Sequence, residues 1–235
     1  MKRNLFAALL LVISFVLIRE AFADLLVNGG FETPTQGPPL FATFNIPAGS
    51  TYITGWTVVQ GNVDLTNTCC YGPLLNTLDP TSTQAVDLIG DNRLSAGVFG
   101  GLSQTFATVP GQQYQLTFDY SHNPGVPSPD FYAAQVTVAD AHVPANTVFS
   151  GQVSQANGPA PWVAFSQTFT ANSNSTLLTF IDTHGAFDAG IYLDDVSVIP
   201  LTATVPETGS AWTMMLLGCL GVGFLAQRWR NSLCA

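Results

Sequence analysis

The chain's clearest structural signal is the segment QYQLTFDY, which runs from Gln113 to Tyr120. Apolar and polar side chains alternate along it, which is the period of a β-strand that buries one face. Similar short runs occur at residues 53–59, 84–89, 102–108, 133–139, 163–170, 177–182 and 191–199. Turn sequences such as Pro110-Gly111 separate them, and no amphipathic helical stretch of useful length interrupts them. We therefore predict an all-β fold, an antiparallel jelly-roll β-sandwich.

The composition excludes nucleic-acid binding. The chain has 235 residues, of which 47% are hydrophobic and only 9% are charged, against about 25% charged residues in an average soluble protein. Between Asp24 and Glu207 the only Lys or Arg is Arg93, whereas fourteen Asp and Glu residues lie there, which gives a formal charge of −13. Proteins that bind nucleic acid need clustered Lys and Arg to displace the counterions of the phosphates, so this segment has no such partner.

The N-terminus has the three parts of a secretory signal peptide. Lys2 and Arg3 form a basic start, residues 5–18 are uncharged and apolar, and Ala21-Phe22-Ala23 provides a small-residue cleavage site. We predict a signal peptide at residues 1–23 and a mature chain that begins at Asp24. A short membrane anchor is the alternative.

Residues 201–235 contain a linker and a second targeting signal. The motif Val205-Pro206-Glu207-Thr208-Gly209 is followed by an uncharged apolar run at residues 210–227 and a basic tail at residues 228–235. About twenty uncharged residues in a helix rise about 30 Å, the thickness of a bilayer core. Arg228 and Arg230 would keep the C-terminal end on the cytoplasmic side. We therefore predict a transmembrane helix, with a buried core helix as the alternative.

This tail resembles the PEP-CTERM sorting signals that exosortase reads. The similarity covers the Val-Pro-Glu motif, Ser210-x-Trp212, Leu216-Leu217-Gly218 and Gly221-x-Gly223-Phe224. Thr208 stands where the second Pro of the motif belongs, which leaves a sortase-like signal open as an alternative. In either case the resemblance implies a bacterial protein that a sorting protease delivers to the cell surface, the cell envelope or the extracellular matrix.

The segment between these ends resembles the choice-of-anchor C family, through strings that recur in order. They are LVNGGFE (26–32), GWTV (55–58), QAVDLIG (84–90), GLSQTF (101–106), YxLxFD (114–119), Wx5TF (162–169) and IYLDDVSV (191–198). This family contains bacterial relatives of plant cell-wall proteins of unknown function. The resemblance implies a galactose-binding-domain-like β-sandwich over residues 24–200, an architecture shared with many carbohydrate-binding modules.

The resemblance also implies a structural Ca²⁺ site made by Glu32, Asp194 and Asp195. In similar carbohydrate-binding sandwiches the first and last strands lie side by side, and acids of the matching motifs share the ion. Ca²⁺ takes roughly six to eight oxygen ligands, which carboxylates and backbone carbonyls supply. Strand alternation predicts Asp194 on the face of Tyr192 and Val196 and Asp195 on the other face, so we expect only one at the metal. The alternatives are solvated acids at strand ends, or caps that accept backbone N–H bonds.

Sugar binding needs an aromatic platform and a few planar polar groups. The candidate ligand-binding residues are Tyr71, Trp162, Asp119, His122 and Asn123. Further aromatics that we expect in loops are Tyr52, Phe99 and Tyr132. Trp56 is expected in the core because it lies inside an apolar run. For each loop aromatic the alternative is packing between the sheets or under a loop.

Cys69 and Cys70 are adjacent and are the only cysteines of the predicted exported domain. Outside the cytoplasm they can form a vicinal disulfide, an intermolecular bridge, or bonds to two other partners. Which of these forms is left open.

No catalytic motif is present, because the chain has no G-x-S-x-G, H-E-x-x-H or P-loop sequence. We therefore predict that the protein is not an enzyme but an exported bacterial cell-surface or matrix protein that binds polysaccharide, for example exopolysaccharide. A structural envelope or biofilm protein that acts through protein–protein contacts is the alternative. A glycoside hydrolase is a minor one, because it needs only two carboxylates. The sequence predicts neither the glycan nor the oligomeric state.

Overall fold

The computed structural model describes residues 23–36, 42–67, 78–90, 99–123, 130–156, 158, 161–185 and 189–201. The chain divides into two compact units after Thr202, and every described strand belongs to the first unit. The strands are β1 (Ala42–Pro47), β2 (Thr57–Gln60), β3 (Asn62–Asn67), β4 (Gln84–Asp87), β5 (Gly101–Ala107), β6 (Gln113–His122), β7 (Phe131–Asp140), β8 (Thr147–Ala156), β9 (Val163–Thr170), β10 (Ser175–His184) and β11 (Ile191–Pro200).

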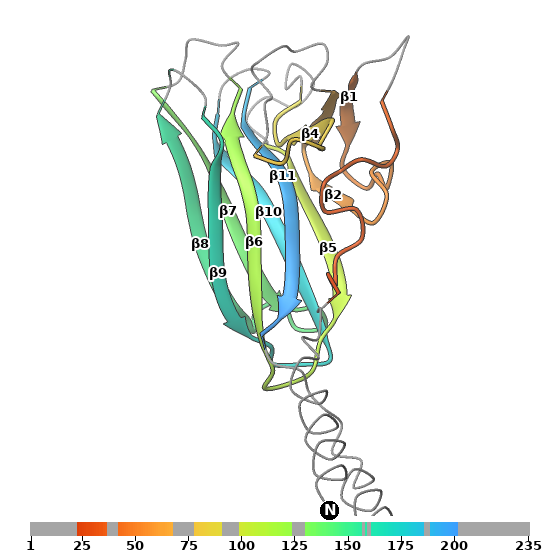
Figure 1. Cartoon of the computed structure of the whole chain (residues 1–235), viewed down its shortest axis with the longest axis vertical. Helices are drawn as coiled ribbons and strands as arrows, with labels where there is room; N and C mark the ends of the chain where they lie inside the picture. The colour runs from red at the N-terminus through yellow and green to blue at the C-terminus, as the bar shows by residue number, and fades with distance from the viewer. Residues whose placement is uncertain are drawn as a thin grey trace, which may run out of the picture. The chain divides into compact units, whose positions relative to one another are not determined.

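These strands form two antiparallel sheets that face each other as a sandwich (Figure 1). Sheet A has six strands in the order β1-β3-β4-β11-β6-β9, and sheet B has five in the order β2-β5-β10-β7-β8. Several neighbours in each sheet are distant in sequence, as in β4-β11-β6, so the connections cross between the sheets in the jelly-roll manner. The predicted all-β antiparallel sandwich is confirmed.

The core lies between the two sheets and follows the period of two. In β6, Tyr114, Leu116 and Phe118 are buried, whereas the intervening Gln115 and Thr117 remain half-buried on the outer face. Such alternation buries one face of a strand and leaves the other to polar side chains.

Aromatic rings join the sheets at the centre of the core. The rings of Trp56 and Phe180 lie 6.2 Å apart, and Phe118 meets Phe180 edge-to-face at 5.0 Å. Trp56 is only 1% exposed, and its Nε1 donates to the Asn28 carbonyl at 3.0 Å. The expectation that Trp56 belongs to the core is confirmed.

Most of the predicted strands are present, but three are additional and one is shorter. The runs at residues 84–89, 102–108, 133–139, 163–170, 177–182 and 191–199 coincide with β4, β5, β7, β9, β10 and β11. The predicted run at residues 53–59 is a strand only in β2, because Gly55 adopts a φ of 84° in a turn before it. The strands β1, β3 and β8 were not predicted; β1 and β8 carry no clear alternation of apolar and polar residues, whereas β3 alternates as NVDLTN.

Several sequence predictions lie outside the described residues. These are most of the signal peptide, the sorting motif from Val205 to Gly209 with the segment after it, Tyr71, and the Cys69-Cys70 pair. Among the residues that the structure describes, no helix is long and apolar enough to cross a membrane.

Candidate functional site

The N-terminal segment lies along the last strand, as the resemblance implied. The Leu25 amide donates to the Val198 carbonyl at 2.9 Å, and the Val196 amide donates to the Gly29 carbonyl at 3.0 Å. A Cβ on Gly29 would come within 1.8 Å of the Val196 carbonyl oxygen. Only glycine therefore permits this approach, which brings the LVNGGFE and IYLDDVSV motifs together.

A β-bulge in β11 turns both aspartates of this motif to the same side. Pairing with β6 is in register up to Asp194 and resumes at Ser197. Asp195 has a φ of 51°, a left-handed conformation that Asp tolerates better than most residues. A Cβ placed on Gly30 would lie 3.5 Å from Asp195 Oδ1 and 3.9 Å from Asp194 Oδ1, so both carboxylates face this loop.

The expected alternation of faces is therefore wrong at this point. Val196 is buried in the main core, whereas Tyr192 packs on the outer face of sheet A with Trp162. The bulge shifts the period by one residue, so Asp194 does not share a face with Val196 and Asp195 is not opposed to Asp194.

Glu32 caps the start of β4. Its Oε1 accepts hydrogen bonds from the amides of Thr83 at 2.6 Å and Gln84 at 3.0 Å. The Ser82 hydroxyl lies 3.2 Å from the same oxygen and 2.6 Å from Asp194 Oδ2. The structure thus places Glu32 in the capping role that was one of the alternatives, and Ser82 links it to Asp194.

Five carboxylates gather here, and we call them the acidic cluster: Glu32, Asp79, Asp119, Asp194 and Asp195. Burial raises the pKa of Asp194 to about 8, with a further contribution from the charges of Asp195 and Glu32. Burial also raises the pKa of Asp195 to about 6, and the charges of Asp79, Asp119 and Glu32 add to it. No Lys or Arg occurs among the described residues. Bound protons or a cation would limit the mutual repulsion of the cluster.

The predicted Ca²⁺ ligands come together without forming a ready coordination sphere. Throughout the described segments, no group of three or more His, Cys, Asp and Glu side chains is arranged to hold a metal ion. The Glu32 carboxylate is occupied by the start of β4, whereas Asp194 and Asp195 face the Gly30 loop. Ca²⁺ binding at these residues stays a prediction.

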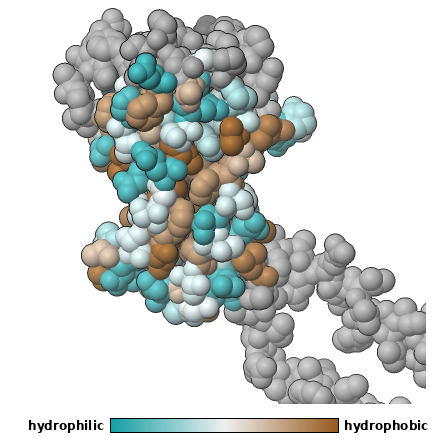
Figure 2. All heavy atoms as spheres, turned by 90° about the vertical axis from the view of Figure 1, so that its left-hand side faces the viewer, coloured by the Kyte–Doolittle hydropathy of each residue, from teal (hydrophilic) through white to brown (hydrophobic). Residues whose placement is uncertain are grey.

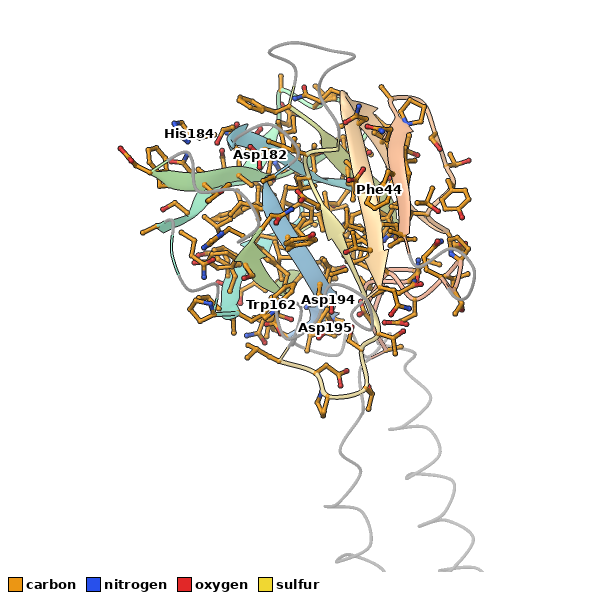
Figure 3. The ribbon with its side chains drawn as sticks, turned by 90° about the horizontal axis from the view of Figure 1, so that it is seen from above. Phe44, Trp162, Asp182, His184, Asp194 and Asp195 are labelled. Carbon is orange, nitrogen blue, oxygen red and sulfur yellow. The ribbon has the colours of Figure 1, made fainter. Side chains whose placement is uncertain are left out.

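Trp162 lies on the outer face of sheet A, near the acidic cluster (Figure 3). Its ring centroid is 6.5 Å from that of Tyr192, which belongs to the same strand as Asp194. Only 8% of Trp162 is exposed, so it offers no open stacking platform. Its buried indole Nε1 has no hydrogen-bond partner within the described part of the chain.

Asp119 shares this outer face. It is directly opposite Asp194 on β11 and Ala164 on β9, and Ala164 follows Trp162 by two residues. Trp162 packs against Tyr192, which precedes Asp194 by two residues on β11 and so points to the same side. This places Asp119 on the face of Trp162. The Asp119 carboxylate is half-buried, makes no hydrogen bond to a described residue, and has a pKa raised by burial and by the charge of Asp79.

His122 and Asn123 do not join these residues. His122 is fully buried between the sheets and stacks on Tyr132, with the ring centroids 4.7 Å apart. Asn123 Nδ2 donates to Asp87 Oδ2 at 3.1 Å, and its amide donates to the Gly190 carbonyl. The expectation that His122 and Tyr132 lie in sugar-contacting loops is wrong, because both belong to core-facing strand positions.

The sequence reasoning missed a second pair of buried acids, at the start of β11. Asp87 Oδ1 accepts from the Gly190 amide at 3.0 Å, and Asp182 Oδ2 accepts from the Ile191 amide at 3.0 Å. Burial raises the pKa of Asp182 to about 7 and that of Asp87 well above its usual range. No local sequence pattern identifies the pair, which depends on the close packing at Gly190, where an added Cβ would lie 2.7 Å from Asp182 Oδ2. These acids tie strand ends together and are not open to a ligand.

The family described as "Protein of unknown function (DUF642)" matches residues 24–198, most of the chain. The chain belongs to this family. Its matched region contains the whole sandwich and both motifs of the acidic cluster.

A curated relative is halomucin of Haloquadratum walsbyi, which is 28% identical over 179 residues. The aligned region covers 75% of this chain but only 2% of halomucin. The chain thus corresponds to a small part of that protein.

Several solved structures are similar to this chain at low identity. A CBM4 structure is 18% identical and covers 74% of this chain and 99% of its own, with a TM-score of 0.42. A CBM61 structure in complex with β-1,4-galactotriose is 16% identical, and the match covers 76% of this chain and 99% of the CBM61 chain, with a TM-score of 0.43. The CBM22-1 xylan-binding domain of Paenibacillus barcinonensis Xyn10C is 17% identical, and the match covers 69% of this chain and 94% of that domain, with a TM-score of 0.43. Because these scores are below 0.5, the assignment of the fold rests on the strand pairing itself.

Proposed function

We propose that the domain is a noncatalytic polysaccharide-binding module whose binding surface is the outer face of sheet A. The observation that carries this proposal is the half-exposed Asp119 carboxylate on that face, beside the polar side chains of β6 and β9. The Trp162 indole N–H and the Asp119 carboxylate have no partner within the described residues. The Asp119 carboxylate is half-exposed and so is open to a ligand, whereas the Trp162 N–H is buried beneath the face. Sugar hydroxyls can donate hydrogen bonds to the carboxylate.

The same face continues as an uncharged polar strip along β6 and β9. Gln115 is opposite Thr168, and Thr117 is opposite Ser166. Gln115 Nε2 donates to the Ser166 hydroxyl at 3.0 Å, which holds the amide against the sheet. Fixed amide and hydroxyl groups at strand spacing suit the repeated hydroxyls of an extended polysaccharide.

The charge of the domain favours a neutral polysaccharide. The segment from Asp24 to Glu207 carries a formal charge of −13, and the acidic cluster borders the proposed surface. An anionic glycan would be repelled unless a divalent cation bridged it to the protein.

Ca²⁺ is the cation that this proposal includes, bound beside Asp194 and Asp195. The mutual repulsion within the acidic cluster and the absence of Lys and Arg from the described residues support it. Its contribution would be structural, because it would hold the N-terminal segment against β11.

The proposal also places the protein outside the cell, as an exported bacterial protein of the choice-of-anchor C type. The signal-peptide pattern before Asp24 and the PEP-CTERM-like tail after Pro200 support it. N-terminal sequencing of the envelope fraction should give Asp24 as the first residue. A chain that still begins with Met1-Lys2-Arg3 would refute the signal peptide.

Affinity electrophoresis tests the binding surface. The fragment 24–202, which contains every described strand, is run through gels that contain single neutral polysaccharides. We expect retardation of the wild type and at least about a tenfold loss of affinity in Asp119→Asn. Trp162→Phe, which keeps a ring but lacks the N–H, should retain the affinity because that N–H is buried beneath the face. Asp140→Asn is the matched control, because Asp140 lies at the end of β7 in sheet B, where it caps a turn. Equal retardation of all four proteins would place the binding surface elsewhere.

A further inference from the structure

The strands β8 and β9 are the free edges of the two sheets on one side of the sandwich. β8 ends the order of sheet B and β9 ends that of sheet A, and the two strands contact each other (Figure 1). β8 has ten residues and β9 has eight, and β8 pairs with β7 without irregularity from Phe149 to Ala156. Because an edge strand pairs on one side only, alternate backbone N–H and C=O groups of β8 point away from the sheet.

Apart from the irregularity between Thr147 and Phe149, the described residues of this edge show none of the features by which proteins block edge-to-edge pairing. The sequences TVFSGQVSQA and VAFSQTFT contain no charged residue and no Pro. The opposite side of the sandwich does have them: β2 has four residues, and β1 ends at Pro47 and is irregular between Thr43 and Ile46. Short, irregular or Pro-containing edges resist pairing with another chain, whereas long uncharged ones favour it.

Apolar side chains lie between the two edge strands. The rings of Phe149 on β8 and Phe165 on β9 are 6.2 Å apart, and both are only half-buried. Val163, at the start of β9, is 36% exposed. Figure 2 shows this side, where apolar and weakly polar residues occupy the narrow middle of the described surface.

We propose that β8 pairs antiparallel with β8 of a second copy of this chain, which joins the two B sheets into one continuous sheet. An antiparallel strand can pair with its own copy around a two-fold axis, so the interface is self-complementary. Phe149 and Phe165 of each copy then lose the exposure that they keep in the single chain.

The distribution of charge selects a second copy as the partner. The segment from Asp24 to Glu207 carries −13, so two copies repel each other wherever their acidic residues face. The edge strands β8 and β9 themselves carry no charged residue that would oppose their pairing. A basic partner would gain nothing at this edge and would bind the acidic faces instead. This dimer does not depend on glycan binding.

Sedimentation velocity of fragment 24–202 across a range of concentrations tests the proposal. We expect the wild type to dimerise, and the dissociation constant to rise about tenfold or more in the double variant Ser150→Lys and Ser154→Lys. Both serines are on β8 and lie two positions either side of Gln152, so antiparallel copies bring their lysines close together. The matched control is Thr105→Lys with Ala107→Lys, which adds the same charge at exposed positions of β5 in the same sheet.

A second measurement covers the case in which the lysine variant fails to fold. Amide hydrogen exchange of the wild type should slow with rising protein concentration in residues 149–156, and remain unchanged in β5. A wild type that stays monomeric, a dimer that the β8 lysines leave intact, or exchange in β8 that is independent of concentration would overturn the proposal. Glycan binding by the monomeric variant would leave the proposed function standing, so the two can fail separately.

Discussion

Replacing Asp182 with Asn should remove a large part of the pH dependence of stability. Asp182 is buried, accepts hydrogen bonds from the amides of Ile191 and His184, and has Asp87 and the His184 ring as titratable neighbours. Burial raises its pKa from 3.8 to about 7, in spite of those hydrogen bonds and of His184. A pKa difference of this size between the folded and unfolded chains changes the free energy of unfolding by about 4 kcal/mol across the pH range between the two pKa values.

The sign follows from the direction of the pKa change. Above pH 3.8 the unfolded chain releases the Asp182 proton, whereas the folded chain keeps it until about pH 7. The stabilisation is therefore complete below about pH 4 and is lost as the pH rises to about 7. The amide introduced by Asp182→Asn does not titrate, so the free energy of unfolding of the wild type should fall by about 4 kcal/mol relative to this variant across the window.

Urea denaturation of fragment 24–202, followed by tryptophan fluorescence at intervals from pH 4 to pH 8, measures the free energy of unfolding of the wild type and of Asp182→Asn. The distant acids Asp194 and Asp195 are present in both proteins, so their contribution cancels in the difference. The charge of Asp182 raises the pKa of Asp87, so the difference includes this coupling. Two parallel curves, with a difference that varies by less than about 1 kcal/mol over the range, would refute the assignment of a protonated Asp182 to the folded state.

Three further predictions concern other parts of the structure. Gly190→Ala would place a Cβ 2.7 Å from Asp182 Oδ2, so urea denaturation should show a loss of about 2–4 kcal/mol, and an unchanged midpoint would be inconsistent with this packing. Trp56→Phe removes a core hydrogen bond and leaves unfilled volume, which should lower the free energy of unfolding by about 1–3 kcal/mol in thermal or chemical denaturation. Ca²⁺ at about a hundred times its Kd should stabilise the wild type by about 2.7 kcal/mol in a thermal shift assay. EDTA and Asp195→Asn should abolish this gain and Asp140→Asn should keep it; a wild type insensitive to EDTA would exclude the ion.

The sequence predicts the fold wherever one face of a strand is buried. The alternation in β6 identifies that strand because its polar residues face outward. In β3 the sequence NVDLTN alternates polar and apolar residues, so this strand was predictable although all six residues are buried. In β8 the apolar residues Val148, Phe149 and Val153 do not share one face, so no alternation marks the strand. Of these two strands, only β8 was therefore missed for a physical reason.

The site is predicted in its composition but not in its geometry. The motifs bring Glu32, Asp194 and Asp195 together, but the bulge at Asp195 depends on pairing with β6 and on the loop at Gly30, which no local pattern encodes. His122 looks like a surface residue because it precedes an Asn-Pro-Gly turn, yet β6 continues to it and Tyr132 covers its ring. Contacts between distant strands decide both outcomes.

A glycan-array screen of fragment 24–202, in Ca²⁺ and again in EDTA, tests the polysaccharide-binding proposal most directly. The account predicts selective binding to neutral polysaccharides in Ca²⁺, at least about tenfold weaker in Asp119→Asn than in Asp140→Asn. An array with no bound glycan in either condition would contradict it.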